Sequence, residues 1–494
     1  MDVVARVRSA TGIVALVALV LAGAGCWLLA GAAPELGRRH VVVGGLPVDE
    51  VHPAGGGRHP GVVVAHGFAG SAKLMAPFGD TLAARGYVVV LLDFSGHGTN
   101  TRPLPDGDRS ADALARDLDV ATAHLRGLPD VDPTRIALVG HSMGAGAVTR
   151  YAAGHPDIGA TVAISLPDAS EVAPERPRRL LLLVGGLEFA GFRTAVAHAV
   201  DGAGPGRASL TVPGVEHITI LYAPRAHRET VTWLDDSLGG PAGGGSPPAP
   251  TRRAAGAGLL LTALLIGIYP VARLALGVHR PWPTLTVPVI GRCAAVAAGA
   301  AVVALPLAAL APAARVPLAV GGFVAGFAAA SGAALLGYAR VRRAGPDEGS
   351  GGAGAGRVAV VAPVLVAYAA LTIAVPLHTG LTSAVPVGPR WWLLACVWAA
   401  LALLAFGADR VADGNAFGVL VVSAVAVFAL TVAAAVGLAP GFLLLIVPLL
   451  AILLLCQAAW GAVLHRSGAP AWLVALVGSL LVAWPLATAL PLVG

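Results

Sequence analysis

Nine long apolar runs divide this sequence and limit how the chain can fold. Residues 11–33 form an uncharged run of 23 residues, which is long enough to cross about 30 Å of hydrocarbon. Only 12% of all residues are charged, against about 25% in a soluble globular chain. Most of the chain is therefore predicted to lie in lipid. The eight later runs are expected near residues 255–277, 288–312, 316–338, 357–377, 391–407, 416–438, 441–463 and 470–492.

Arginine placement predicts the orientation of these runs, because positively charged loops stay in the cytoplasm. Arg6 and Arg8 precede the first run, which we interpret as an uncleaved anchor, with a cleaved signal peptide as the alternative. This topology predicts a multi-pass membrane protein in which the region after the first run is extracytoplasmic. The cytoplasmic loops then carry Arg273, Arg280, Arg292, Arg340, Arg342, Arg343, Arg357, Arg410 and Arg466, whereas the outer loops carry Arg315 and Arg390.

Residues 34–238 have a different composition and are predicted to form one α/β domain. Short apolar runs bounded by Gly, Pro or Asp are typical of strands that are buried on both faces. A helical pattern such as residues 108–128 lies between them, and this alternation indicates a mostly parallel sheet. Around this domain we expect an anchor at 1–33, a Gly/Pro-rich linker at 239–254 and a membrane domain of about eight helices at 255–494.

A serine flanked by glycines lies in the middle of this polar region. The segment Gly140-His141-Ser142-Met143-Gly144 stands between a predicted strand and a helix start that is rich in small residues. A serine that attacks a carbonyl must be exposed on a sharp turn, and glycine two residues to either side relieves the crowding there. The pattern therefore indicates that Ser142 is a nucleophile, which a neighbouring base must activate.

The polar region resembles the α/β-hydrolase superfamily, in its dienelactone hydrolase and esterase-like branch. The resemblance covers about residues 40–238 and is carried by HGFAG at 66–70, DFSGHG at 93–98 and GHSMG at 140–144. It implies an α/β-hydrolase-type, mostly parallel sheet flanked by helices. In this chain such a domain would be fused to an all-α transmembrane domain.

The same resemblance implies a catalytic triad in the chain order serine, acid, histidine. His217 follows a predicted strand and a short loop, and its imidazole would take the proton of Ser142. Glu188, just beyond another strand, would hold that imidazole in the correct tautomer. Asp168, at the end of the preceding strand, is the alternative acid.

The resemblance also implies an oxyanion hole, made by the backbone N–H groups of Phe68 and Met143. Residues 169–178 stand where many lipases of the superfamily insert a lid domain of several tens of residues. The site is therefore predicted to be open, so that a bulky substrate or one delivered from a membrane surface can reach it.

These features predict a membrane-anchored serine hydrolase that cleaves an ester, thioester or related acyl bond through an acyl-enzyme. Two alternatives stay open: an acyltransferase with the same triad, and a transport or binding protein whose hydrolase-like domain is catalytically silent. Few ionisable residues stand inside the apolar runs, which favours a scaffold or lipid-binding anchor over an ion-coupled transporter.

The expected partners are the lipid bilayer and an acyl or ester substrate, with a lipid-like substrate as one option. No sequence pattern indicates a cofactor or a metal site, and the net charge of +6 is attributed to loop arginines, not to a nucleic-acid surface. All four cysteines lie in apolar stretches, so the polar domain is expected to hold no disulfide. The sequence carries no signal for an oligomeric state.

Overall fold

The structure is a computed structural model that describes residues 2–32, 36–170, 172–240, 247–277, 286–310, 316–342 and 353–494. It divides into two compact units. The α/β unit comprises residues 25–257, 377–383 and 491–494. The helical unit comprises residues 1–24, 258–376 and 384–490. The domain limits given above stay predictions, and linker residues 241–246 lie outside the described residues.

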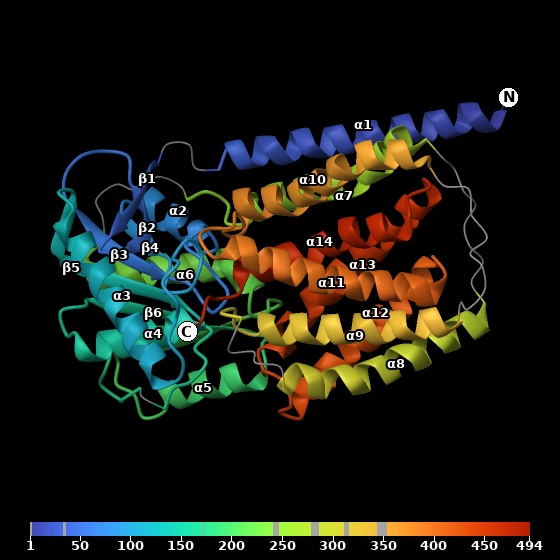
Figure 1. Ribbon diagram of the computed structural model, residues 1–494. Helices are drawn as coiled ribbons and strands as arrows, with labels where there is room; N and C mark the ends of the chain where they lie inside the picture. Colours follow the sequence, from blue (N-terminus) through green and yellow to red (C-terminus); the bar gives the residue numbers. More distant parts are fainter. Residues whose placement is uncertain are drawn as a thin grey trace. The chain divides into compact units, whose positions relative to one another are not determined.

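An eight-stranded sheet forms the centre of the α/β unit (Figure 1). The strand order is β1-β2-β4-β3-β5-β6-β7-β8. All pairs from β4 to β8 in this order are parallel, which confirms the predicted fold class. The strands are β1 (Gly37–Val43), β2 (Leu46–His52), β3 (His59–Ala65), β4 (Val88–Leu92), β5 (Val131–His141), β6 (Ala160–Ile164), β7 (Leu180–Gly185) and β8 (Arg207–Val212).

Helices cover both faces of the sheet, which explains why strands such as β4, β6 and β7 are almost uniformly apolar. In β3, Val62 and Val64 pack with α2 and α6 on one face, whereas Val63 and Ala65 pack with α3 and α4 on the other. The fifth helix packs with β7 on this second face. The helices are α2 (Ala76–Ala84), α3 (Asp108–Gly127), α4 (Met143–Gly154), α5 (Ala190–Val200) and α6 (Pro224–Leu238).

The first two strands form an antiparallel hairpin that the sequence reading did not predict. Its register pairs Val43 with Leu46, so only Gly44 and Gly45 form the turn. Both glycines have positive φ, at 56° and 80°, as a tight two-residue hairpin turn requires. A Gly-Gly pair between two apolar runs was the available signal.

Two short segments from the far C-terminal part of the sequence belong to the α/β unit. The last residues reach the loop after β4, where Leu492 donates its N–H to the carbonyl of Gly96 at 2.8 Å. The carbonyl of Leu492 accepts the N–H of Leu104 at the same distance. The other segment, residues 377–383, bonds to the loop after β3 and is described with the site below.

Nine helices among the described residues are long and apolar enough to cross a membrane, as the sequence predicted. The first is Ala10–Ala30, the apolar part of α1 (Asp2–Ala30). The other eight are α7 (Arg252–Leu276), α8 (Val287–Leu310), α9 (Gly321–Arg342), α10 (Ala355–Gly380), α11 (Arg390–Ala412), α12 (Ala416–Ala435), α13 (Leu443–Arg466) and α14 (Ala471–Ala489).

Three arginines of the helical unit form hydrogen bonds to residues at the ends of other helices. Arg292 of α8 and Arg342 of α9 both donate to Asp413, which follows α11. Arg390 is fully buried and donates to the carbonyls of Ala487 and Leu490 at the end of α14, at 2.9 and 2.8 Å. The last carbonyl groups of a helix have no hydrogen-bond partner within that helix, so the N–H groups of an arginine can supply the missing hydrogen bonds. Arg280, Arg315 and Arg343 lie outside the described residues.

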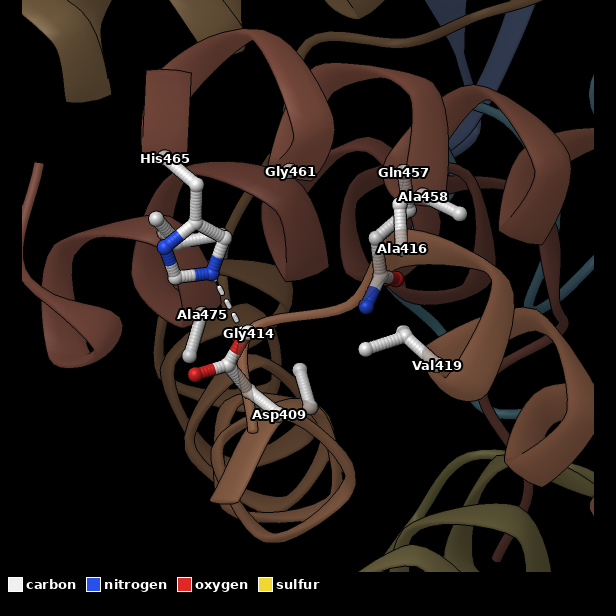
Figure 2. A pocket seen from close by; sticks show the side chains of 11 residues that line it. Asp409, Gly414, Ala416, Val419, Gln457, Ala458, Gly461, His465 and Ala475 are labelled. Atoms are coloured by element: carbon white, nitrogen blue, oxygen red, sulfur yellow. Dashed lines mark hydrogen bonds and ion pairs between the residues drawn. The ribbon is translucent and has the colours of Figure 1, made fainter. Parts of the chain in front are cut away.

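The helical unit also contains an acid–histidine pair that the sequence reading missed. Asp409 of α11 lies 2.5 Å from the Nε2 atom of His465 on α13. Figure 2 shows this pair at a small pocket that is also lined by Gln457 and Val419. Asp409 is 5% exposed, and the pair keeps this buried carboxylate hydrogen-bonded.

Because the apolar side chains of the central strands are buried, truncating one of them should lower the free energy of unfolding strongly. Leu182 of β7 is fully buried against α5, so Leu182→Ala should lower the free energy of unfolding by about 2–5 kcal/mol. Val42→Ala, at a side chain that is 64% exposed, should cost less than about 0.5 kcal/mol. Thermal unfolding of the detergent-purified chain measures both, and equal midpoints for the two variants would contradict this packing.

Candidate active site

Ser142 occupies a strained turn between β5 and α4. Its φ and ψ are 53° and −118°, a region that a non-glycine residue adopts at a cost of about 1–3 kcal/mol. The N–H of Ser142 donates to the carbonyl of Ile164 on β6 at 2.8 Å, and its carbonyl accepts the N–H of Gly146 in α4. Strand and helix therefore hold the turn from both sides and leave the side chain at the sheet edge.

Glycines are required around this turn because backbone approaches from three directions. A Cβ atom on Gly144 would lie 2.5 Å from the carbonyl oxygen of His66, and one on Gly140 would overlap the carbonyl of Gly144. A Cβ atom on Gly67 would lie 3.0 Å from the Cβ atom of Ser142. The first two contacts explain the G-x-S-x-G pattern, and the third places the loop after β3 directly against the serine.

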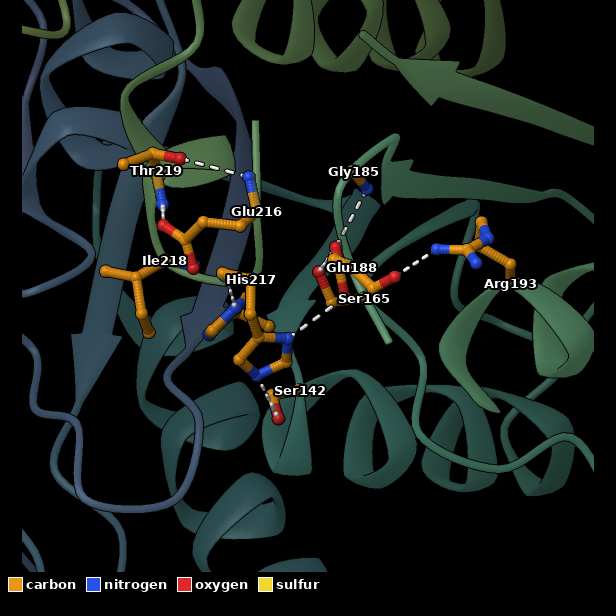
Figure 3. A network of polar contacts seen from close by, with 10 residues as sticks. Ser142, Ser165, Gly185, Glu188, Arg193, Glu216, His217, Ile218 and Thr219 are labelled. Atoms are coloured by element: carbon orange, nitrogen blue, oxygen red, sulfur yellow. Dashed lines mark hydrogen bonds and ion pairs between the residues drawn. The ribbon is translucent and has the colours of Figure 1, made fainter. Parts of the chain in front are cut away.

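The structure brings Ser142, His217 and Glu188 together in one hydrogen-bonded line (Figure 3). The Nδ1 atom of His217 lies 3.0 Å from the Glu188 Oε2 atom, and its Nε2 atom lies 3.0 Å from the Ser142 Oγ atom. With the proton on Nδ1, the imidazole donates to the carboxylate and accepts from the hydroxyl. Asp168, the alternative acid, is exposed and bonds to the N–H and hydroxyl of Ser170.

The second carboxylate oxygen of Glu188 is held by two donors. It accepts the hydroxyl of Ser165 at 2.6 Å and the N–H of Gly185 at 2.8 Å. Ser165 is fully buried and has a φ of 56°, so it is a second strained serine at this edge of the sheet. The sequence reading missed it, although a serine directly after a predicted strand was the available signal.

The loop that carries His217 is fixed on both sides. The carboxylate of Glu216 accepts the N–H groups of Ile218 and Thr219, which holds the start of a 3-10 turn at Thr219–Tyr222. On the other side, the Nε2–H group of His141 donates to the carbonyl of His217 at 2.9 Å. The last helix of the domain, α6, begins only at Pro224, because this 3-10 turn comes first.

The loop with the proposed oxyanion donor Phe68 is anchored by buried polar groups. His66 donates from Nδ1 to the carbonyl of Gly67 at 2.8 Å and accepts the N–H of Phe94 at Nε2. Asp93 accepts the N–H of Ala72 at 2.7 Å, which fixes the far end of the same loop. The other proposed donor, Met143, begins α4, and its N–H belongs to the first turn, which has no acceptor inside the helix.

A further bond joins this loop to the segment 377–383. The hydroxyl of Ser71 lies 2.9 Å from that of Thr382 and accepts the N–H of Ser383 at 3.1 Å. These partners are 311 and 312 residues apart in the sequence, so no local pattern indicated the contact. The loop that carries Phe68 is thus bonded to residues that follow the helix α10.

Comparison with known proteins supports the fold of this domain. Residues 60–207 match the family model described as the alpha/beta hydrolase fold. The chain contains an alpha/beta-hydrolase domain. The matched range includes Phe68, Ser142, Met143 and Glu188, and it ends before His217.

Several individual proteins are similar to this hydrolase domain. An uncharacterized protein of Mycobacterium tuberculosis is 35% identical over 132 residues, which are 26% of this chain and 45% of that protein. Cutinase est1 of Thermobifida alba is 30% identical over 118 residues, 23% of this chain and 37% of that protein. The chain thus matches less than half of the length of these curated relatives. The solved alpha/beta hydrolase GrgF from Penicillium sp. sh18 is 12% identical, with 41% of this chain and 99% of that one covered and a TM-score of 0.35.

A cavity of about 350 Å³ adjoins the nucleophile turn of the hydrolase domain. Met143 lines it together with the apolar side chains of Leu114, Leu166 and Val172. Asp168 is one of the polar residues that line the same cavity. Among the residues that the structure describes, no group of three His, Cys, Asp or Glu side chains could hold a metal ion.

Three histidines of the hydrolase domain are buried, and burial lowers their pKa values. Burial lowers the pKa of His141 to about 3, and the neighbouring His217 adds to this shift. Burial likewise lowers the pKa of His227 to about 4 and that of His66 below its usual value. These three imidazoles therefore stay neutral in the folded domain near pH 7.

This burial predicts a loss of stability on acidification. Unfolded histidines bind protons near pH 6.5, whereas the folded domain excludes those protons until about pH 3 to 4. The stabilising contribution is complete above pH 6.5 and falls as the pH drops towards the folded pKa, by at most about 1.4 kcal/mol per pH unit for each histidine. Thermal unfolding at pH 7.5 and 5.0 measures this slope.

A matched pair of variants isolates the contribution of one imidazole. His141→Gln keeps an N–H donor for the carbonyl of His217 but removes the titrating group, so its midpoint should fall less between the two pH values. Val42→Ala, at an exposed apolar residue of the same domain, removes no titrating group and should keep the wild-type slope. Identical slopes for His141→Gln and wild type would show that burial of His141 does not govern acid stability.

Proposed function

We propose that the chain is a membrane-anchored serine hydrolase that cleaves an ester, thioester or related acyl bond. The observation that carries this proposal is the line from Glu188 through His217 to Ser142, with both heavy-atom distances at 3.0 Å. Separations of this size allow proton transfer between hydroxyl and imidazole without any rearrangement. The cutinase relatives and the family match support hydrolysis as the type of reaction.

The reaction would follow from the positions of these groups. The Ser142 Oγ atom attacks the substrate carbonyl carbon while its proton moves to the His217 Nε2 atom, and Glu188 stabilises the imidazolium. The N–H groups of Phe68 and Met143 stabilise the negative charge on the carbonyl oxygen. The intermediate then expels the alcohol or thiol, which takes the proton from His217. Water, activated by the same imidazole, releases the acid and restores Ser142.

An apolar rim around the triad supports a substrate with a large apolar group. Leu187, Phe189 and Ile218, which we call the apolar rim, are 68%, 57% and 44% exposed. They directly adjoin Glu188 and His217 in the chain, and the N–H of Leu187 bonds to the loop before His217. Exposed bulky apolar residues gathered at one site usually mark a surface that contacts other apolar material.

Chain connectivity supports a site close to a membrane surface. Six residues separate the end of α1 at Ala30 from the start of β1 at Gly37, and they can reach at most about 20 Å. At the C-terminal end of the domain, a short linker joins α6 to α7. With α1 and α7 as membrane spans, the hydrolase domain would be held at the bilayer on its extracytoplasmic side, and lipid-like esters would be within its reach.

Labelling with a fluorophosphonate probe tests the nucleophile. Wild-type membranes should be labelled and Ser142→Ala membranes should not, because the probe forms a bond only with an activated serine. Equal labelling of the two would end this proposal. Product analysis with and without an added alcohol then separates hydrolysis from acyl transfer.

The acid is tested by a matched pair of amide substitutions. Glu188→Gln should lower kcat for a soluble ester by about 10⁴-fold, since an amide no longer stabilises the imidazolium or fixes its tautomer. Asp168→Asn changes an exposed acid that bonds to Ser170 and not to His217, and it should leave kcat near wild type. A larger loss in Asp168→Asn than in Glu188→Gln would reverse the assignment.

The apolar rim is tested by chain-length selectivity. Replacing Leu187, Phe189 and Ile218 together with serine should lower the ratio of kcat/KM for p-nitrophenyl laurate to that for the acetate by at least tenfold. Val42→Ser, at an equally exposed apolar residue of the same domain, should leave this ratio unchanged. An unchanged ratio in the triple variant would show that the rim does not bind the acyl chain.

A further inference from the structure

A second cavity of the α/β unit is lined by several basic side chains and by none of the triad residues. It has a volume of about 250 Å³, and we call it the basic pocket. Arg38 and Arg39 of β1, Lys73 of the loop after β3, Arg253 of α7 and His378 of α10 line it. All of these residues belong to one compact unit.

Two of these cations are held in place by one buried carboxylate. Asp80 of α2 is 3% exposed and accepts hydrogen bonds from Arg38 and from the Nε atom of Arg253, the latter at 2.8 Å. Fixing both guanidinium groups in advance reduces the entropy that a bound ligand must remove. The positive charge is only partly offset, since the four cations Arg38, Arg39, Lys73 and Arg253 meet the three carboxylates of Asp80, Asp49 and Glu50, and the Asp80 ion pairs include neither Arg39 nor Lys73.

The two acidic residues that line the basic pocket, Asp49 and Glu50, are hydrogen-bonded to histidines. Glu50 lies 2.7 Å from His124 and 3.2 Å from His52, and Asp49 lies 2.7 Å from His40. These contacts draw the two carboxylates toward their own partners. Arg39 and Lys73 are therefore the groups best placed to recognise an added anion.

Three predicted spans end beside this pocket. The span Ala10–Ala30 ends seven residues before Gly37, the first residue of the strand that carries Arg38 and Arg39, while Arg253 opens one span and His378 closes another. At the same junction the guanidinium of Arg252 lies 5.3 Å from the Trp27 ring centroid, and its Nε atom donates to the carbonyl of Leu28. Tryptophan and arginine at span ends are typical of the headgroup layer of a bilayer.

We propose that the basic pocket binds the phosphate group of an anionic membrane lipid. Its volume corresponds to roughly eight water molecules, which accommodates a phosphate and part of a headgroup. Arginine offers a fork of N–H donors that matches phosphate oxygens, and lysine adds a mobile point charge. This inference rests on membrane insertion of the spans and is independent of the hydrolase chemistry at Ser142.

The full-length chain, purified in detergent, tests the basic pocket with a fluorescent phosphatidylglycerol, and inorganic phosphate serves as the competing soluble ligand. The double variant Arg39→Gln/Lys73→Gln should weaken phosphatidylglycerol binding at least tenfold, because each cation near a membrane surface contributes appreciably to binding an anionic lipid. The control Arg58→Gln/Arg109→Gln removes the same charge from exposed positions outside the pocket and should bind like wild type. Arg39→Lys/Lys73→Arg keeps both charges and should retain most of the affinity.

The outcomes separate the possible ligands. Tighter binding of phosphatidylglycerol than of inorganic phosphate, lost in the pocket variant alone, supports a lipid phosphate. Inorganic phosphate bound as tightly as the lipid, with the same dependence on Arg39 and Lys73, assigns the site to soluble phosphate and overturns the lipid as its source. Equal affinities in the pocket and control variants overturn the phosphate site itself. Fluorophosphonate labelling of Ser142, which should persist in every variant, distinguishes failure of this inference from failure of the hydrolase proposal.

Discussion

The strained turn at Ser142 is the constraint on which the rest of the α/β unit depends. A serine with a φ of 53° is unfavourable by itself, and it persists because β5 is paired on both sides and α4 begins directly after the turn. Glycine at positions 140, 144 and 67 lets three stretches of backbone approach closer than any side chain would allow. The strain and the close packing therefore belong to one arrangement, which leaves the half-buried hydroxyl at the carboxyl edge of the sheet.

Residues far apart in the chain meet at that edge because parallel strands all end there. The acid follows β7, the histidine follows β8, and Ser165 follows β6. Each is then fixed by a bond to its neighbours: Ser165 to Glu188, and His141 to the carbonyl of His217. The loop with Phe68 is fixed in the same way, and one of its bonds comes from Thr382, in the segment after α10. Residues next to a predicted membrane span thus contribute to the surroundings of the proposed oxyanion hole.

The helical unit shows how far apolar patterning predicts structure and where it stops. Length and composition indicated nine spans, because a helix must bury its backbone polar groups within itself to cross lipid. The orientation of charged residues near helix ends was not predictable in the same way. Asp409 stands next to Arg410 near the end of α11, a position that suggests a solvated loop, yet it lies against His465 of α13. Only the packing of α11 against α14, which itself packs against α13, determines which side of α11 faces His465.

The sequence by itself determined the apolar strands, the long apolar helices and the identity of the candidate nucleophile, but not the hairpin of β1 and β2. Apolar strands such as β4, β6 and β7 require helices on both faces, and a serine between spaced glycines requires a sharp turn, so both follow from local chemistry. Other features were decided only by the tertiary structure. They include the position of Glu188 beside His217 where Asp168 had been an alternative, the contact between Ser71 and Thr382, and the convergence of Arg38 and Arg253 on Asp80. The physical reason is that hydrogen bonds act over about 3 Å, while the residues that form them are separated by tens to hundreds of positions along the chain.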